Sequence, residues 1–475
     1  MTGPQTSGDG QHDGQHDGQD AVTRLVRGGL PVLLLLGTLA ALAELASRPL
    51  ANFDTYFHLR FGQEFRTGAW SLWHPGHVST LEHAHWVPTQ WLTEVVMSQM
   101  EHWFGLAGVA WLAGLLFLTY ALTLYATSRR RASLLVIASL LPVALGASAS
   151  GISMRPQVLS YIACAITTAA WVRARETGRA PWLLIALTWV WAMCHGMWPV
   201  GIATGVVAAI GIILDGGPRR MLLVPLLSLV AGGLTPVGPR LYGAVLLVNS
   251  RGKYFSEWGP PHFTTVPCLL LLVLLAAAVV PMLRRGTNSW FEIAMIAVIC
   301  VWSVYSQRTV PVAAALVMPI ATANLQSLLG ATAPAVRRER VVVLGGAAAV
   351  LAVLACVVPS TADQPPRQPA WVASTLSALP PGTTVLDDEL WGGFLMWRYP
   401  QLNLAAHGYG DVYTTAELDD MSKIVSLHPG WPTLVARTGA RYALYKPDTP
   451  IAYALRQRGW TVVHRSADVE LLRAP

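Results

Sequence analysis

Long apolar runs alternate with short polar segments along most of the chain. A helix that crosses a bilayer needs about 20 predominantly apolar residues. Windows of this kind, some of them shorter, lie near 28–47, 105–126, 133–149, 157–173, 181–195, 197–214, 221–237, 265–283, 289–305, 309–329 and 341–359. The pattern predicts a mainly α-helical, polytopic membrane protein with about eleven transmembrane helices.

Basic residues fall in every second gap between these windows. Lys and Arg in short loops mark the cytoplasmic side of a membrane protein. The basic tufts consist of Arg24 and Arg27; Arg129, Arg130 and Arg131; Arg173, Arg175 and Arg179; Arg219 and Arg220; Arg284 and Arg285; and Arg337, Arg338 and Arg340. We therefore expect a protein of the plasma (inner) membrane, with a cytoplasmic N-terminus and an extracytoplasmic C-terminal region.

The outer gap between the first two windows, residues 48–104, is too long for a simple connection. It begins with "DTYFHLRFGQEF", in which Asp54 and His58 are four positions apart and share one helical face. An apolar stripe recurs at the same spacing: Phe57, Phe61 and Phe65. This pattern is typical of an amphipathic helix that lies at the membrane interface.

The second half of the same gap contains another amphipathic stretch, "WVPTQWLTEVVMSQMEHWFG". Its tryptophans, Trp86, Trp91 and Trp103, are of the type that anchors at headgroup depth. Glu94 would be the acid on the buried side of this helix. We therefore expect two interfacial helices in the first outer loop.

The last part of the chain has shorter apolar runs and more turn residues. The segments "TTVLDDE", "LNLAAHG", "YALYKP", "WTVVHR" and "VELLRAP" predict short strands. Thr414 and Glu417 have the spacing of a capping box that opens a helix to about residue 427. A second helix is bracketed by Thr449, Pro450 and Gly459.

These patterns divide the chain into three parts. Residues 1–27 include "GDGQHDGQHDGQD", which has no apolar residue to bury and predicts a disordered cytoplasmic tail. Residues 28–359 form the predicted transmembrane domain. Residues 360–475 form a small extracytoplasmic α/β domain that is long enough to have its own core.

Composition agrees with this picture and excludes several classes of protein. The 475 residues are 53% hydrophobic and only 12% charged, with a mean hydropathy of +0.44, which excludes an ordinary soluble domain. The net charge of +7 comes mostly from the loop arginines, so we expect no nucleic-acid partner. The five cysteines lie in or beside apolar segments without CxxC spacing, which favours small buried hydrophobes over metal ligands or disulfides: Cys164, Cys194, Cys268, Cys300 and Cys356.

Asp54 supports two interpretations from local sequence alone. An Asp in the first turn of a helix is often a cap or an interfacial acid. The same carboxylate could be a general base, or a metal ligand, held at the membrane surface. The local pattern leaves both open.

Four further ionisable residues lie at the ends of predicted spans on the outer side: Arg155, His195, Glu257 and Arg308. Charged groups at such positions cost free energy and tend to line cavities or binding sites, although each alone could be an interfacial anchor. Together with Asp54 they predict the rim of a polar cavity. Such a cavity suits an anionic, lipid-linked substrate, because Arg binds phosphate bidentately. The chain has neither a GxGxxG motif after a strand nor a GKT or GKS loop, which argues against a nucleotide donor.

The residues of the first outer loop resemble a known family. An acid soon after the first span, in a long outer loop with interfacial helices, is similar to the GT-C superfamily of polyprenyl-phosphate-sugar-dependent glycosyltransferases, and more closely to a set of bacterial membrane proteins of this type. The matching positions are Asp54, Tyr56, Phe57, His58, Gly62, Trp86, Trp91 and Glu94. Later segments that resemble the same group are "MRPQ", "HG", "TPVGPRLY", "EW", "QR" and "WGGFLMWRYP".

The resemblance implies an inverting sugar transfer on the extracytoplasmic face, from a polyprenyl-phosphate-linked sugar to an acceptor hydroxyl on a glycan, lipid or protein. Asp54 would be the catalytic base and His58 would orient it or touch the acceptor. The implied substrate-binding residues are Glu94, Arg155, His195, Glu257 and Arg308. Of these, the arginines, with His195, would stabilise the leaving phosphate, and Glu257 would bind a sugar hydroxyl.

Two departures from the family pattern affect what can be carried over. Many GT-C enzymes have adjacent acids in the first loop, whereas Asp54 is followed by Thr55; a divalent metal cofactor stays open and no metal ligands are assigned. Related chains tend to have Asp-Gly-Arg in the tail where this one has His407, Gly408 and Tyr409, before Asp411 and Tyr413. The role of that turn therefore does not follow from the resemblance.

A protein of another class would fit the same fold. A non-catalytic lipid-binding or scaffold protein could keep the membrane domain and use its C-terminal domain to bind a partner. A transporter is less favoured, because the spans show no internal repeat and lack acids near the midplane. The discriminating feature is whether the polar side chains converge on one cavity.

Overall fold

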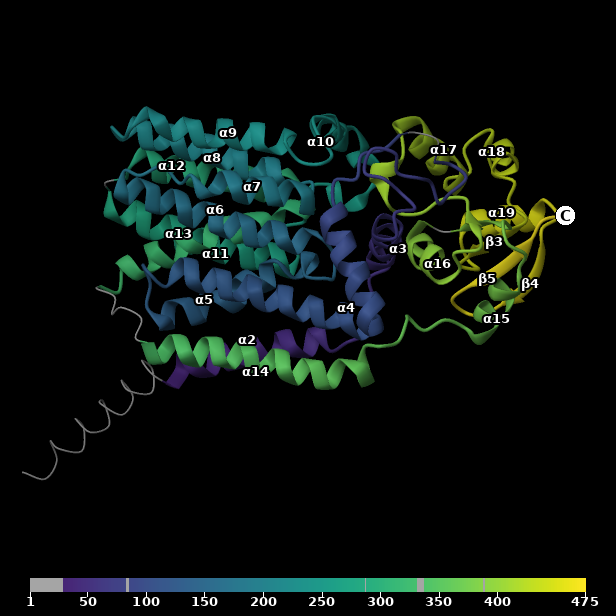
Figure 1. Cartoon of the computed structure of the whole chain (residues 1–475), viewed down its shortest axis with the longest axis horizontal. Coiled ribbons are helices and arrows are strands. Elements are labelled where there is room, and N and C mark those ends of the chain that lie inside the picture. Colours follow the sequence, from purple (N-terminus) through teal and green to yellow (C-terminus); the bar gives the residue numbers. More distant parts are fainter. Residues whose placement is uncertain (1–28, 83–84, 287, 331–336, 388) are drawn as a thin grey trace, which may run out of the picture.

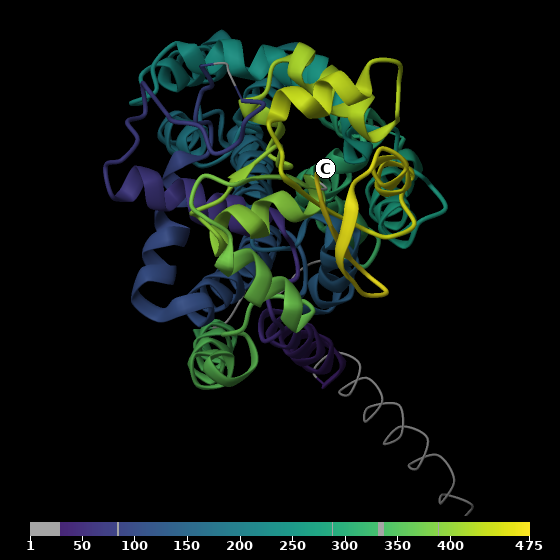
Figure 2. The same ribbon diagram turned by 90° about the vertical axis from the view of Figure 1, so that its right-hand side faces the viewer.

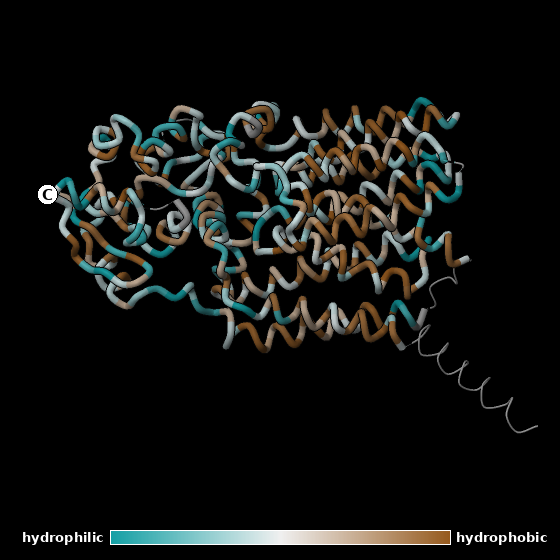
Figure 3. Tube along the Cα trace, turned by 180° about the vertical axis from the view of Figure 1, so that it is seen from behind, coloured by the Kyte–Doolittle hydropathy of each residue, from teal (hydrophilic) through white to brown (hydrophobic). Residues whose placement is uncertain are grey.

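The computed structural model describes residues 29–475 apart from 83–84, 287, 331–336 and 388, so the predicted tail at 1–27 lies outside the described residues. Figure 1 shows a bundle of helices with roughly aligned axes at one end of the molecule and a mixed helix and strand region at the other. Figure 3 shows that the most hydrophobic segments lie along the helices of the bundle. This division matches the predicted change of character along the chain.

A helix overlaps each of the eleven predicted apolar windows. These helices are α2 (Leu30–Ala46), α4 (Trp91–Ser128), α5 (Leu134–Ala147), α6 (Gln157–Thr177), α7 (Leu183–Cys194), α8 (Trp198–Leu214), α9 (Leu223–Gly233), α11 (Val266–Arg285), α12 (Trp290–Tyr305), α13 (Val310–Ser327) and α14 (Arg337–Thr361). Among the described residues, four helical stretches are long and apolar enough to cross a membrane: Trp91–Ser128, Val266–Arg285, Gln307–Ser327 and Glu339–Thr361. Five further apolar helices have 17 residues or fewer, so the count of eleven full spans stays a prediction.

The centre of the bundle is α13, which packs against α5, α6 and α11. Its run of small residues, Ala313, Ala314 and Ala315, is completely buried and lets neighbouring helices approach closely. At the periphery, α14 is mostly exposed, as expected for an apolar helix that faces lipid. Cys164, Cys194 and Cys268 are buried, whereas Cys300 and Cys356 are exposed on apolar helices, and all five are free thiols.

The first predicted interfacial helix is α3 (Asp54–Arg66). It does not lie on a membrane surface alone, because it is enclosed between α4 and α16 (Glu389–Arg398), as Figure 1 also shows. The approach to α4 is so close that a Cβ on Gly62 would lie 2.0 Å from the Glu94 carbonyl oxygen. The aromatic stripe therefore packs into protein, and Phe57 and Phe61 are buried.

The second predicted interfacial helix is the first part of α4. It continues into the span through a bend at Gly105, whose φ of 62° and ψ of −160° only glycine adopts readily. The expected depth of its tryptophans is wrong for Trp86, which is 3% exposed and packs between the rings of Phe61 and Tyr409. Trp103, in contrast, is 63% exposed.

The C-terminal region contains a five-stranded mixed sheet. Its strands are β1 (Thr384–Asp387), β2 (Asn403–Leu404), β3 (Tyr442–Tyr445), β4 (Thr461–Arg465) and β5 (Glu470–Arg473), in the order β2-β1-β3-β5-β4. β1 is parallel to β2 and β3, while β5 is antiparallel to β3 and β4. Each strand lies in one of the five predicted segments.

Helices cover this sheet and connect it to the bundle. They are α15 (Ala370–Ala378), α16, α17 (Thr415–Val425), α18 (Trp431–Thr438) and α19 (Pro450–Gln457). The predicted capping box of Thr414 and Glu417 opens α17, and Thr449 is the N-cap of α19. Figure 2 shows the C-terminal region lying across the end of the bundle.

The C-terminal region interlocks with the first outer loop. The Thr80 N–H donates to the Leu404 carbonyl at 2.8 Å, and His407 forms a buried ion pair with Glu82. A continuous apolar core runs from the bundle through α3 into α16 and the 409–413 segment. The boundary at residue 360 stays a prediction, since packing continues across it.

Candidate functional site

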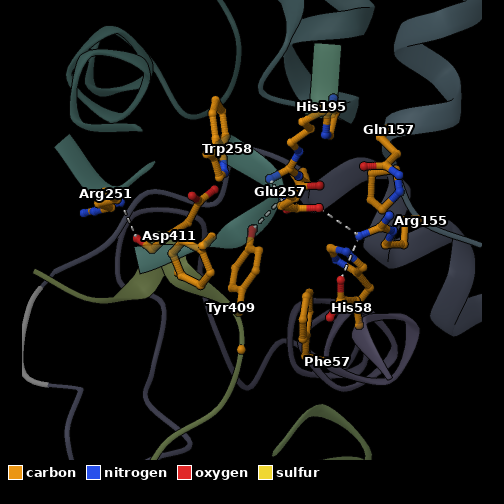
Figure 4. Close-up of a pocket in the computed structure, with 17 residues that line it drawn as sticks. Phe57, His58, Arg155, Gln157, His195, Arg251, Glu257, Trp258, Tyr409 and Asp411 are labelled. Carbon is orange, nitrogen blue, oxygen red and sulfur yellow. Dashed lines mark hydrogen bonds and ion pairs between the residues drawn. The ribbon is translucent and has the colours of Figure 1, made fainter. Parts of the chain in front are cut away.

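A polar cavity lies where the end of the bundle meets the C-terminal region (Figure 4). Its walls come from α3, the turn before α6, the joint between α7 and α8, the 251–258 segment, the turn before α13 and the 408–411 segment. The lining residues are Asp54, Phe57, His58, Gln90, Arg155, Pro156, Gln157, His195, Arg251, Phe255, Glu257, Trp258, Arg308, Gly408, Tyr409, Gly410 and Asp411. Six of the seven predicted site residues therefore line one cavity.

Asp54 occupies the first turn of α3 but does not cap it with its side chain. The helix begins where the Asp54 N–H donates to Asn52 Oδ1 at 2.9 Å. The Asp54 carboxylate instead accepts a hydrogen bond from Arg155, with 2.8 Å between Oδ2 and Nη1. Thr55 ties the same helix to the turn that carries Arg155, because its hydroxyl donates to the Met154 carbonyl at 2.9 Å. The Asp54 side chain therefore does not act as a helix cap; it pairs with Arg155 instead.

Glu257 joins the two predicted arginines. Arg308 Nη1 donates to Glu257 Oε1 at 2.7 Å, and Arg155 Nη1 lies 3.8 Å from Glu257 Oε2. The Arg308 guanidinium also lies over the Trp258 ring, 5.1 Å from its centroid. The side chains of the arginines are 12% and 22% exposed, whereas those of Asp54 and Glu257 are 41% and 40% exposed. The two carboxylates are therefore more accessible from the cavity than the two guanidiniums are.

The charge state of Asp54 is set by two opposing influences. Burial raises the pKa of its carboxyl, because the charged form loses hydration. The Arg155 guanidinium lowers the pKa of the same group and only partly offsets burial. The result is a carboxyl with a pKa above that of an ordinary Asp, so its deprotonated form is a stronger base.

Each of the two predicted histidines is hydrogen-bonded to a buried side chain behind the cavity wall. His58 Nδ1 lies 2.9 Å from Glu94 Oε1, and both side chains are almost fully buried. Burial lowers the pKa of His58 well below its usual value, with Arg155 and His195 adding to the effect. His195 Nδ1 lies 2.7 Å from Ser160 Oγ, which also accepts a hydrogen bond from the Trp191 indole at 2.7 Å.

Glu94 is the predicted substrate-binding residue that does not line the cavity. Its side chain is completely buried behind His58, between α3 and α4. The sequence pattern correctly placed it on the buried side of its helix. In this arrangement its contact is with His58, so Glu94 can orient the ring but cannot reach a ligand directly.

Part of the cavity wall was not predicted. The Arg251 Nη1 donates to the Asp411 carbonyl at 3.1 Å, and Thr89 Oγ1 donates to Asp411 Oδ2 at 3.2 Å. The Gln90 amide donates to the Tyr409 hydroxyl at 3.1 Å. The signal that could have pointed here is the "HGYGD" turn, whose polar and aromatic residues between glycines differ from the apolar pattern around them.

The donor set does not fit a divalent metal ion. Among the described residues, no group of three or more His, Cys, Asp or Glu side chains is arranged to hold one. The Asp54 and Glu257 carboxylates instead face the Arg155 and Arg308 guanidiniums, which supply the positive charge of the cavity. An anion, rather than a cation, is the ligand that these guanidinium donors would bind.

Comparison with known proteins identifies the fold. No family model matches the chain, and no curated protein matches it. Among solved structures, the archaeal oligosaccharyltransferase AglB from Archaeoglobus fulgidus, in complex with an inhibitory peptide and a dolichol-phosphate, is similar over 86% of this chain and 69% of its own, with a TM-score of 0.58 and 11% identity. The apo form of the Archaeoglobus fulgidus oligosaccharyltransferase is similar over 87% and 69%, with a TM-score of 0.55 and 12% identity.

A bacterial structure also matches nearly the whole chain. ArnT from Cupriavidus metallidurans, bound to undecaprenyl phosphate, covers 93% of this chain over 97% of its own length, with a TM-score of 0.49 and 16% identity. The resemblance inferred from the sequence motifs is confirmed for the fold: the fold of this chain is similar, over most of its length, to that of GT-C polyprenyl-phosphate-sugar glycosyltransferases. This fold and the apolar helices indicate an integral membrane protein.

Proposed function

We propose that the protein is an inverting membrane glycosyltransferase that moves a sugar from a polyprenyl-phosphate donor to an acceptor hydroxyl. The observation that carries the proposal is the pairing of Asp54 with Arg155, next to Arg308, in one cavity at the end of the bundle. A base and an anion site within one cavity are what this transfer requires. The fold supports the proposal, because the similar structure of AglB is in complex with a dolichol-phosphate.

The transfer would be a single displacement at the anomeric carbon of the sugar. Asp54 accepts the proton of the acceptor hydroxyl as its oxygen forms a bond to that carbon. The bond between the anomeric carbon and the phosphate oxygen breaks, and polyprenyl phosphate leaves with the electron pair. Arg155 and Arg308 stabilise the negative charge that develops on the leaving phosphate. The configuration at the anomeric carbon inverts.

The other predicted residues support this chemistry from fixed positions. His58, held by Glu94, lies beside Asp54 on α3 and would position the base or the acceptor. His195 would contribute hydrogen bonding near the leaving phosphate, held by Ser160. Glu257 would bind a sugar hydroxyl once it is released from Arg308.

The proposed acceptor is extracytoplasmic. The basic tufts that predict the cytoplasmic side lie at helix ends, where Arg131 pairs with Glu176 and Arg285 with Glu292. The cavity lies at the opposite end of the same helices, beside the C-terminal region. With the positive-inside rule, this arrangement supports a cavity that faces the outside and a donor that enters from the outer leaflet.

The Asp54→Asn variant tests the proposal. Asn keeps the shape of the side chain but cannot take a proton, and losing a general base costs about 10²- to 10⁴-fold in rate. Cell-envelope glycans and lipid-linked sugars would be compared between a strain lacking the gene and strains complemented with wild type or Asp54→Asn. The matched control is Asp448→Asn, because the Asp448 side chain is 98% exposed and remote from the cavity.

We expect the wild type and Asp448→Asn to restore the missing glycan and Asp54→Asn to leave it missing, with equal amounts of all three proteins in the membrane. Full restoration by Asp54→Asn would contradict the proposal and would favour the scaffold or lipid-binding alternative. The glycan that disappears identifies the acceptor, and the lipid-linked sugar that accumulates identifies the donor.

A further inference from the structure

The Glu257 carboxylate lies between the two arginines that the proposed function assigns to the phosphate. We infer that Glu257 is an internal stand-in for the phosphate: it closes the anion subsite in the substrate-free protein and must leave before polyprenyl phosphate binds. This inference rests on the proposed function and adds a regulatory contact to the same site. Figure 4 shows Glu257 extending into the cavity toward Arg155.

The geometry of the contact is that of an occupied anion site. Glu257 Oε1 accepts a hydrogen bond from Arg308 at 2.7 Å, and its other oxygen lies 3.8 Å from Arg155. Carboxylate and phosphate are bound by the same guanidinium donors, so either anion fits between these side chains. Glu257 leaves the arrangement incomplete, because Arg308 Nε is buried without a hydrogen-bond partner among the described residues. A phosphate offers more acceptor oxygens than one carboxylate and could satisfy that donor.

A phosphate and the Glu257 carboxylate cannot both occupy the position between Arg155 and Arg308, because both are negatively charged. In the cavity two carboxylates, Asp54 and Glu257, balance the two guanidiniums of Arg155 and Arg308. A phosphate would add a third anion at salt-bridge distance. Like charges at such short separation repel strongly in a partly dehydrated site. Asp54 sits on a packed helix and stays with Arg155, so Glu257 is the carboxylate that leaves.

The local fold allows Glu257 to move. It lies on a short 3₁₀ turn, Ser256–Trp258, which is flanked by extended residues Phe255 and Gly259. Displacing this turn breaks no α-helix and no strand ladder. A second cavity of about 420 Å³ adjoins the first and shares Phe255 and Trp258 with it, so the segment has space beside it.

Contacts with the C-terminal region hold the segment in its closed position. The Tyr254 hydroxyl lies 2.6 Å from Asp419 Oδ1 on α17. The Phe255 ring packs so closely on Gly410 that a Cβ there would lie 2.4 Å from the ring. The position of Glu257 therefore depends on the C-terminal region as well as on the arginines.

The test measures binding of a polyprenyl phosphate to the purified full-length protein in detergent, with the matching polyprenol as the probe that lacks phosphate. Glu257→Gln keeps the shape of the side chain and removes its charge. We expect it to bind polyprenyl phosphate about five- to tenfold more tightly than wild type, and polyprenol equally well. The matched control is Glu176→Gln, which also removes a carboxylate from an arginine pair but lies at the opposite end of the bundle.

The outcomes separate this inference from the proposed function. Tighter phosphate binding in Glu257→Gln but not in Glu176→Gln supports the inference. Unchanged or weaker phosphate binding in Glu257→Gln overturns it, while a wild type that prefers polyprenyl phosphate to polyprenol keeps the proposed function. If neither wild type nor Glu257→Gln distinguishes the two probes, the proposed function fails as well.

Discussion

Arginine and carboxylate pairs occur at both ends of the helical bundle, but they are built differently. At the basic end, Arg129 binds both oxygens of Glu339, with distances of 2.6 and 2.9 Å, and the side chains are 10% and 12% exposed. At the cavity end, Arg308 makes one short bond to Glu257, whose side chain is 40% exposed. The first pair is bidentate and largely enclosed, with Glu339 bordering a cavity that is otherwise almost entirely apolar, while the second presents a more exposed carboxylate to a polar cavity.

This difference separates structural from functional ion pairs better than their residue types do. In a bidentate, enclosed pair, two N–H donors of the guanidinium are hydrogen-bonded to the two carboxylate oxygens. Neither group then offers these atoms to a ligand. A pair with a single bond and an accessible carboxylate can exchange its partner for another anion. The contrast predicts that changes at the cavity end alter activity and ligand affinity, and that changes at the basic end alter stability.

The largest effect at the cavity end, after loss of the base itself, is expected for Arg155→Gln. Losing one donor to the leaving phosphate should lower the transfer rate about 10²- to 10³-fold. The variant should also change the pH profile. Arg155 lowers the pKa of Asp54, so its removal raises that pKa further. Asp54 acts as a base only when deprotonated, and the acid limb of the profile should therefore move to higher pH.

The measurement is the initial rate of sugar transfer from a polyprenyl-phosphate donor to membrane acceptors as a function of pH. Arg131→Gln is the control, because Arg131 pairs with Glu176 at the basic end. A slow Arg155→Gln variant with an unshifted acid limb would mean that Asp54 does not determine the profile. A variant as fast as wild type would remove Arg155 from the mechanism.

An intermediate effect, on stability alone, is expected for Glu339→Gln at the basic end. The change leaves the Arg129 guanidinium without its carboxylate and weakens the 2.6 Å contact with the Tyr125 hydroxyl. Breaking a largely enclosed pair should cost about 1–3 kcal/mol of unfolding free energy, below the range for a fully buried pair. Thermal unfolding of the purified protein would measure the loss.

The same variant should bind polyprenyl phosphate with wild-type affinity, which is the reverse of the result expected for Glu257→Gln. Altered affinity in Glu339→Gln, or a stability loss in Glu257→Gln as large as that in Glu339→Gln, would break the distinction between the two ends. Measuring both properties on both variants therefore tests the comparison directly.

Much of the fold follows from local patterns in the sequence. Runs of apolar residues locate the helices of the bundle, because an apolar surface is the main requirement for a helix that is buried in protein or lipid. The capping box at Thr414 and Glu417 locates the start of α17, because its hydrogen bonds are local. The convergence of Asp54, Arg155 and Arg308 on one cavity was also foreseeable. Each residue follows or precedes a span on the same side, so the alternation of spans brings them to one end.

Other parts of the site depend on contacts that no local pattern encodes. Trp86 has the profile of an interfacial anchor, yet α16 and the 409–413 segment, more than 300 positions later, cover the first outer loop and bury it. The same packing brings Tyr409 and Asp411 to the cavity. Periodicity can show which face of a helix is buried, as for Glu94, but it cannot show which segment covers that face.

The smallest expected effect belongs to Tyr254→Phe, and it tests how the accessible pair is held. The Tyr254 hydroxyl contacts Asp419 at 2.6 Å and the Thr415 carbonyl at 3.1 Å, which links the segment bearing Glu257 to α17. A hydrogen bond at a partly exposed site of this kind contributes about 1 kcal/mol. Its loss should shift the segment toward the open position and raise the affinity for polyprenyl phosphate about two- to fivefold, less than Glu257→Gln does. Tyr453→Phe, at a side chain on α19 that is 60% exposed, is the control in the same binding measurement. If Tyr254→Phe binds the phosphate as wild type does, the arginines alone hold Glu257 in place. The pair at the cavity end would then need no support from the C-terminal region, just as the pair at the basic end needs none.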